Sequence, residues 1–173
     1  YFSGMFGSSF GGGFNQLSTG AGLGFSSAYY VRYDNLVVYE TPSLAGFKAA
    51  VGYAFNADDR RTAQTGFATA DNTRAITAGL RYDNGPLMGF ATYDQLNASN
   101  QLSQNQVDAT PRSYIVGGSY DFEVFKVALA YNRITDGWFA GKSLPNGGSI
   151  GTFTGTPSYA FAKGFRSNSY MLA

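Results

Sequence analysis

The chain has 173 residues and a formal net charge of +1, and only 13% of its residues are charged, about half the usual share of a soluble domain. The near balance of basic and acidic residues argues against a nucleic-acid binder, and the aromatic content of 17% excludes a disordered chain. Cysteine and histidine are both missing, which removes thiolate nucleophiles, histidine bases and the commonest metal ligands. We therefore expect no catalytic residue, no metal site and no cofactor.

Membrane-spanning helices are not expected, because no stretch approaches 18 consecutive apolar residues. The apolar residues instead alternate with a period of two, which indicates β-strands. In the segment 47–55, for example, Phe47, Val51 and Phe55 fall on one face and Lys48 falls on the other. Strands are expected at 35–40, 47–55, 73–82, 87–95, 113–120 and 125–132, and from about residue 167. These seven or so segments have about the length that a tilted strand needs to cross a bilayer.

The connections between the expected strands alternate in length. Three are short, at 41–46, 83–86 and 121–124, whereas the connections between them are long, at 56–72, 97–111 and 135–165. Short turns at one end and long loops at the other are typical of an outer-membrane barrel, with the turns on the periplasmic side and the loops outside the cell.

Aromatic residues gather at both ends of the expected strands. One set lies beside the short turns and comprises Tyr39, Phe47, Tyr82, Tyr120 and Phe125. The other lies toward the long loops and comprises Tyr53, Phe55, Tyr93 and Tyr131. Two such rows are expected to flank the apolar band of a membrane barrel. The alternative is a soluble β-core with the ordinary enrichment in tyrosine and phenylalanine.

The segment 32–55, RYDNLVVYETPSLAGFKAAVGYAF, resembles the general porins of Gram-negative bacteria, and most closely the trimeric 16-stranded type of β-proteobacteria. The positions that match the family pattern are Arg32, Asn35, Val37, Tyr39, Pro42, Gly46 and Phe47. The hairpin segments YDNGPL at 82–87 and SYDFEVFKVALAY at 119–131 resemble later strands of the same family. The resemblance implies an all-β fold, a transmembrane antiparallel β-barrel in the outer membrane. It also implies a homotrimer, with a water-filled channel through which small hydrophilic solutes and ions diffuse passively.

The same resemblance places residues 1–31 in the loop that narrows the pore, and residues 32–173 in the sixth to twelfth strands. The family's loop usually carries acidic residues, whereas 1–31 contains none and has phenylalanines at Phe2, Phe6, Phe10 and Phe14. Seven strands cannot close such a barrel without leaving unpaired backbone groups in the lipid. We therefore expect the chain to be a fragment of a protein roughly twice as long.

If the apolar faces meet lipid, the opposite faces line the pore. The residues expected there are Arg32, Lys48, Arg81, Asp94 and Lys126, with Arg32 placed near the constriction by the resemblance alone. Positive side chains at a narrow aqueous passage attract anions, so we expect a mild anion preference. The alternative is that these residues are solvated wall charges far from the narrowest point.

Four arginines adjoin the long loops and share the parity of the lipid-facing side chains: Arg74, Arg112, Arg133 and Arg166. Arginine is poorly tolerated at the bilayer midplane but acceptable at its interface, where it can pair with the phosphates of lipopolysaccharide. The alternatives are non-specific contact with the headgroups and burial against a neighbouring subunit.

Two other functions stay open at this point. The first is a substrate-selective channel on the same barrel, for sugars or organic anions, which the phenylalanine-rich first segment would suit. The second is a non-channel adhesin or soluble β-sandwich, in which the alternating apolar faces would pack on each other. No function that binds nucleic acid is expected.

Overall fold

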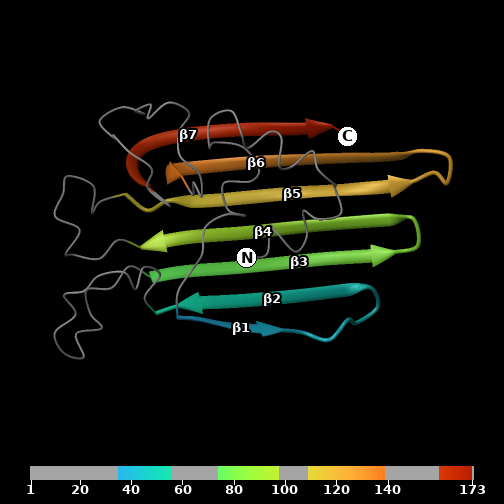
Figure 1. The fold of residues 1–173 in the computed structure, drawn as a ribbon, viewed down its shortest axis with the longest axis horizontal. Helices are drawn as coiled ribbons and strands as arrows, with labels where there is room; N and C mark the ends of the chain where they lie inside the picture. Colours follow the sequence, from blue (N-terminus) through green and yellow to red (C-terminus); the bar gives the residue numbers. More distant parts are fainter. Residues whose placement is uncertain (1–34, 56–73, 98–108, 139–159, 173) are drawn as a thin grey trace.

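The structure is a computed structural model of the chain, and it describes residues 35–55, 74–97, 109–138 and 160–172. The described residues form one antiparallel sheet of seven strands, in which each strand pairs with the next one along the chain (Figure 1). The strands are β1 (Leu36–Glu40), β2 (Phe47–Ala54), β3 (Arg74–Asn84), β4 (Leu87–Asn97), β5 (Arg112–Asp121), β6 (Lys126–Trp138) and β7 (Ala160–Leu172).

The three short connections are tight turns at the same end of the sheet (Figure 1). Between β3 and β4, Asn84 pairs directly with Leu87, so the turn consists of Gly85 and Pro86. Gly85 has φ +55, as expected for glycine at the first central position of a type II′ hairpin turn. After β5, the Phe122 N–H donates to the Phe125 carbonyl at 2.9 Å.

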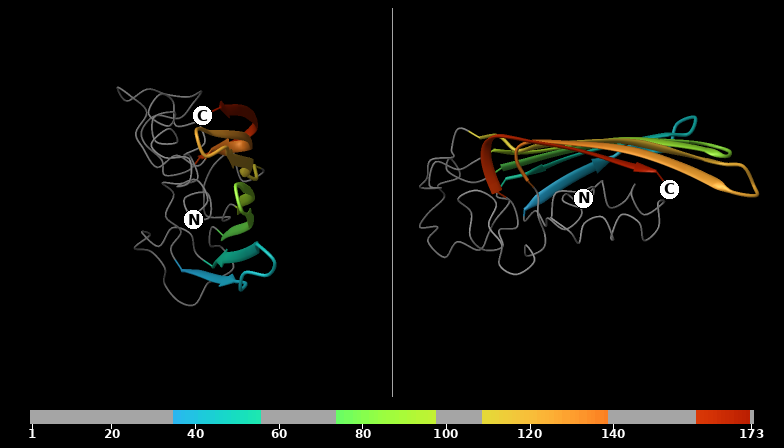
Figure 2. Two further views of the ribbon diagram at one scale, coloured as in Figure 1. Left: turned by 90° about the vertical axis from the view of Figure 1, so that its right-hand side faces the viewer. Right: turned by 90° about the horizontal axis from the view of Figure 1, so that it is seen from above.

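The sheet has two chemically different faces, which the register keeps in line from strand to strand. On the inner face, Thr77 pairs with Asp94, and Asp94 pairs with Ser113. On the outer face, Ala91 pairs with both Leu80 and Val116. Inner-face residues in the middle of the strands are buried, whereas outer-face residues are largely exposed. Figure 2 shows that the sheet is curved, as a piece of a barrel wall would be.

Several strands differ in length from the sequence prediction. The largest difference is at the expected loop 135–165, because β6 continues to Trp138 and β7 already begins at Ala160. The pairing of these strands is interrupted by a bulge between Thr135 and Gly137. The expected boundaries of that loop are therefore wrong at both ends, and β3, β4 and β5 also extend one or two residues beyond the predicted ends.

Within the described ranges, no helix is long and apolar enough to cross a membrane.

Candidate pore wall and membrane surface

The outer face carries a continuous band of exposed apolar side chains. Val51, Leu80, Val116 and Leu129 lie on β2, β3, β5 and β6, and each is between 46% and 58% exposed. An apolar patch of this extent is rare on a soluble monomer and marks a surface that meets protein or lipid. The expected alternation of the two faces is confirmed on these strands.

Aromatic rings border this band at both ends of the strands. On the side of the short turns, the ring centroids of Phe47 and Tyr82 lie 4.4 Å apart, and further pairs in the turn after β5 join Tyr120 to Phe122 and Phe122 to Phe125. On the side of the long connections, the rings are 4.9 Å apart in the Tyr53–Phe55 pair and 5.1 Å apart in the Tyr93–Tyr114 and Tyr131–Tyr170 pairs. We call the row beside the long connections the upper aromatic row. Tyr114 and Tyr170 belong to it and have the parity of the outer face, although they were not among the aromatic residues expected there.

The upper aromatic row slopes across the sheet. Following the register from Tyr53 on β2 across β3, β4 and β5 leads to Thr135 on β6. The tyrosine of β6, Tyr131, lies four residues below Thr135, so the row descends about one residue per strand. With a rise of about 3.3 Å per residue and a strand spacing of about 4.8 Å, this slope corresponds to a strand tilt of about 35°, within the range of transmembrane barrels.

An arginine belt, made of Arg74, Arg112, Arg133 and Arg166, lies just beyond the upper aromatic row on the outer face. Arg112 and Arg166 both pair with Thr135, and Arg133 pairs with Tyr114. In the regularly paired part of the described strands, these four arginines are the only charged residues on the outer face. Their expected parity is therefore confirmed, and the apolar band itself is free of charge there.

The inner face holds a row of polar side chains at the depth of the upper aromatic row. Thr77, Asp94, Ser113 and Asn132 are each 0% or 1% exposed, and the Ser113 hydroxyl donates to Asn132 Oδ1 at 3.4 Å. Neither carboxylate oxygen of Asp94 has a hydrogen-bond partner among the described residues. Asp94 thus lies on the predicted face, in a setting of hydroxyl and amide groups.

Charged residues gather on the inner face near the short turns. Lys48 Nζ lies 2.7 Å from Glu40 Oε2. Arg81 donates twice to Asp83, from Nε to Oδ2 at 2.6 Å and from Nη2 to Oδ1 at 2.8 Å. These two ion pairs stand side by side, because Lys48 and Arg81 are register partners. The charges of Lys48 and Arg81 are therefore each balanced by a neighbouring carboxylate.

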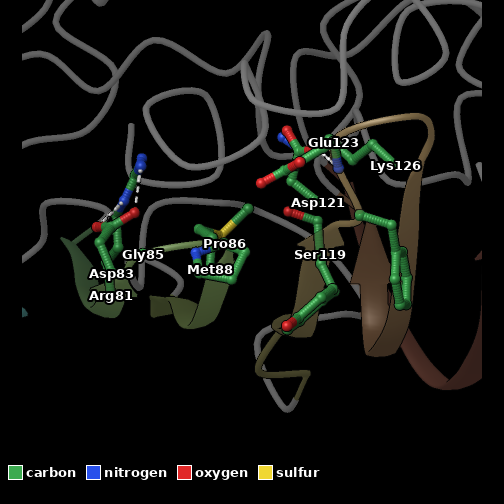
Figure 3. Close-up of a pocket in the computed structure, with 11 residues that line it drawn as sticks. Arg81, Asp83, Gly85, Pro86, Met88, Ser119, Asp121, Glu123 and Lys126 are labelled. Atoms are coloured by element: carbon green, nitrogen blue, oxygen red, sulfur yellow. Dashed lines mark hydrogen bonds and ion pairs between the residues drawn. The ribbon is translucent and has the colours of Figure 1, made fainter.

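Lys126 lies across the same end of the sheet, at the start of β6, and is exposed. It borders a hollow of about 680 Å³ whose wall also includes Arg81, Met88, Ser119 and Asp121 (Figure 3). In the described part of the chain, Lys126 takes part in no ion pair. Of the predicted wall cations that the structure describes, it is the one whose charge is not paired.

A hydrophobic patch separates the two polar regions of the inner face. It is formed by Ala50, Met88, Phe90, Ile115, Ala128 and Ala130, each 2% to 7% exposed, with Val38 packed against it. These positions were expected on the pore side by their parity, but an apolar patch there was not predicted. Phe90 and Ile115 could have indicated this patch, because large apolar residues are unexpected on a wall that only faces water.

Two further predictions lie outside the described residues: Arg32 and the constriction segment 1–31. Among the residues described, no group of acidic side chains could hold a metal ion. The described sheet is apolar on one side and polar on the other.

The comparisons with known proteins agree with this two-faced sheet. The family model described as Gram-negative porin matches residues 2–168. The chain belongs to the Gram-negative porin family. This confirms the resemblance, the all-β fold, the outer-membrane location and the absence of an enzymatic role.

Two porins illustrate the extent of the similarity. An outer membrane porin protein of Bordetella pertussis is 55% identical over 172 residues, which cover 94% of this chain and 43% of the relative. Outer membrane porin protein 32 of Delftia acidovorans is 32% identical over 151 residues, covering 79% of this chain and 38% of the relative. The chain thus spans about two-fifths of the length of these relatives. No solved structure matches it.

Proposed function

We propose that the protein is a general diffusion porin, in which the inner face of this sheet forms part of the wall of a water-filled channel. The observation that carries the proposal is the pair of aromatic rows on either side of an uncharged apolar band, with polar and charged side chains on the opposite face. This is the arrangement that a β-barrel needs to expose its outside to lipid and its inside to water.

The proposal is tested with the full-length porin that carries this sequence, reconstituted into planar lipid bilayers. A diffusion porin should give discrete current steps that scale with salt concentration, and it should pass small uncharged sugars in a liposome swelling assay. Detergent-solubilised protein that inserts as a folded barrel but gives no steps and no swelling would contradict the proposal.

The complete assembly is proposed to be a 16-stranded barrel that forms a homotrimer in the outer membrane. The tilt of about 35° supports a transmembrane barrel, and the outer edges of β1 and β7 pair with no other described strand. Both edges therefore need further strands, because unpaired backbone groups are costly in lipid. Cross-linking of the full-length porin in membranes should yield trimers.

Residues 1–31 are proposed to form the constriction loop. Support comes from the chemistry of the inner face: Phe90 and Ile115 present an apolar surface where a porin wall normally meets water, and the segment 1–31 is rich in phenylalanine and lacks acidic residues. We propose that apolar contact, rather than an ionic network, holds this loop against the wall.

We propose that the pore has a mild preference for anions. The pairing of Lys48 with Glu40 and of Arg81 with Asp83 cancels two of the expected cations, so the preference rests on Lys126 and on Arg32. Reversal potentials in a salt gradient test this: replacing Lys126 and Arg32 together with glutamine should abolish the preference, and an unchanged reversal potential would contradict it.

A substrate-selective channel for sugars or organic anions is the second candidate. The observation in its favour is the row of hydroxyl and amide side chains around Asp94, which could offer hydrogen bonds to a solute. Saturation of the solute flux at rising concentration would favour this candidate over simple diffusion.

We further propose that the arginine belt contacts lipopolysaccharide at the outer leaflet. Arginine at the interface costs little, and its planar fork suits phosphate.

A further inference from the structure

The hollow of about 680 Å³ on the inner face lies at the end of the sheet that carries the short turns. Met88 and Ser119, which are register partners on β4 and β5, form its buried base. The turn between β3 and β4 borders one side with Gly85 and Pro86, and the turn after β5 borders the other side with Glu123 (Figure 3). The volume of this hollow is in the range of pockets that bind small molecules.

One side of the hollow is electrically neutral. It carries Arg81 and Asp83, and the guanidinium of Arg81 donates to both carboxylate oxygens of Asp83, at 2.6 and 2.8 Å. The two charges cancel within this bidentate pair. The charge that a solute meets in the hollow therefore comes from the opposite side.

The opposite side carries charges of both signs that are not paired with each other. Lys126 and Asp121 are register partners on the inner face, and opposite charges in such positions usually attract each other. Here the Glu123 N–H donates to Asp121 Oδ1 at 2.9 Å, which ties that carboxylate to the turn. Lys126 and Glu123 are both exposed and line the hollow. Within the described residues, the ion pairs are formed elsewhere on the sheet.

A buried hydroxyl at the base of the hollow is an independent indication of a ligand. Ser119 is 5% exposed, and its Oγ has no hydrogen-bond partner among the described residues. Figure 3 shows this oxygen turned toward the hollow. Burying a hydroxyl group without a partner is unfavourable, so this position favours a solute that offers a hydrogen bond.

The arrangement of charges selects the class of solute. A simple anion is attracted by Lys126 but repelled by Asp121 and Glu123, and a simple cation is attracted by the carboxylates but repelled by Lys126. An uncharged solute leaves charges of both signs without a partner. A zwitterion matches both signs at once, because its carboxylate lies against the ammonium group of the protein and its own ammonium group lies against a carboxylate.

We infer that this hollow is a weak binding site for a zwitterionic solute, an α-amino acid, with its carboxylate held by Lys126 and its ammonium group held by Glu123 and the Ser119 hydroxyl. The inference rests on the proposed function, because it places the site at the periplasmic mouth of the channel. It goes further by naming a class of solute that a water-filled pore does not select by size alone. Weak binding suits a channel, since a solute that enters the site must also leave it.

Ligand-detected NMR of the full-length porin in deuterated detergent micelles tests the site, with isotope-labelled L-alanine as the probe. Saturation transfer to the alanine methyl group should level off as the alanine concentration rises. Unlabelled glycine should displace the labelled alanine. Lactate and isopropylamine are almost the same size as alanine but carry only its carboxylate or only its ammonium group, so each should displace alanine much less effectively than glycine does.

Two substitutions test the charges of the site. Lys126→Gln and Glu123→Gln should each raise the dissociation constant of alanine about five-fold or more, because each removes one charge-assisted hydrogen bond. A site for anions would instead be strengthened by Glu123→Gln, and a site for cations would be strengthened by Lys126→Gln. Lys163→Gln is the matched control, because it removes an exposed lysine near the start of β7, at the other end of the sheet, and it should leave alanine binding unchanged.

The hydroxyl is tested by Ser119→Ala. This variant should bind alanine more weakly than the wild type without a lower free energy of unfolding, because the hydroxyl makes no hydrogen bond within the described fold that could be lost. A serine with only a structural role would give the reverse result, with lower stability and wild-type binding of alanine.

Alanine binding that is strengthened or left unchanged by Glu123→Gln would overturn the inference, and so would lactate that displaces alanine as well as glycine does. The planar-bilayer currents of the same preparations separate the two claims. A wild type that conducts but shows no saturable alanine signal contradicts only the amino-acid site, whereas a folded wild type without current contradicts the proposed function.

Discussion

An arginine placed in the middle of the outer face gives a quantitative test of the membrane surface. Leu129 is 58% exposed and lies on β6, two residues from Tyr131 and four from Phe125 on the same face. With a rise of about 3.3 Å per residue and a tilt of about 35°, Leu129 is roughly 5 Å below the upper row and roughly 11 Å above the lower one. Its side chain therefore projects into the hydrocarbon region of the bilayer.

Leu129→Arg should reduce the free energy of unfolding by about 2–4 kcal/mol, which is the cost of arginine near the midplane of a transmembrane barrel. Asn97→Arg is the matched control, because Asn97 lies on the same face beside Arg74, beyond the upper aromatic row. The expected cost there is about 1 kcal/mol or less. The measurement is equilibrium unfolding of the full-length porin in guanidinium, in the presence of lipid vesicles.

A lipid-facing and a water-facing outer face predict clearly different costs in unfolding free energy in this experiment. On a water-exposed surface, substitution of a half-exposed leucine changes stability by only about 0.5 kcal/mol. A cost below that value for Leu129→Arg, or equal costs for Leu129→Arg and Asn97→Arg, would refute the assignment of this face to lipid.

Three further predictions concern the inner face and the turns. Phe90→Ser should raise the single-channel conductance of the full-length porin, because it weakens the apolar contact proposed to hold the constriction loop; an unchanged conductance and noise level would argue against that contact. Lys126→Gln should shift the reversal potential toward cations more than Lys48→Gln does, since Lys48 is already paired with Glu40; the opposite order would contradict the role given to pairing. Gly46→Ala should lower thermal stability more than Gly85→Ala, as judged by unfolding temperature. Both glycines have positive φ, but a Cβ at Gly46 would meet the Asp83 carbonyl oxygen at 2.3 Å, whereas the space at Gly85 is open.

Much of the fold could be predicted from the sequence because lipid and water impose opposite chemistry on the two faces of each strand. In the segment 47–55, which contains β2, the alternation of Phe47, Val51 and Phe55 with Lys48 was sufficient to assign the faces, and the structure confirms them. The short turns were equally predictable, since the Asn84-Gly85-Pro86 segment combines residues that favour a tight hairpin.

The end of β6 could not be predicted in the same way. Asp136 and Gly137 are a strong turn signal in sequence, and they lie at the start of the loop that was expected from residue 135. In the structure both have positive φ, at +57 and +149, but they form a bulge within the strand. The Gly164 N–H on β7 donates to Asp136 Oδ1 at 3.0 Å, so the strands remain connected. The Asp136-Gly137 pair thus has the positive φ values typical of a turn, but the strand does not end there. It continues because it pairs with β7, and this pairing depends on residues far away in the sequence.

The ion pairs were also missed, although a signal existed. Arg81 and Asp83 are two residues apart on one strand and thus share a face, which allows the bidentate contact that forms. The pair of Lys48 with Glu40 needs the register between β1 and β2, which depends on the turn that joins them. Lys48 and Arg81, which were predicted to act singly on the pore, are therefore found in pairs.

The central claim is that one face of this sheet meets lipid and the other meets the water of a conducting channel. The sequence contains no cysteine, so single cysteines introduced at Lys126 and at Val116 can be compared directly in the reconstituted full-length porin. A membrane-impermeant, bulky thiol reagent should reduce the current through the Lys126→Cys channel and leave the Val116→Cys channel unmodified. Modification of Val116→Cys in the bilayer, together with an unchanged current through Lys126→Cys, would contradict the account.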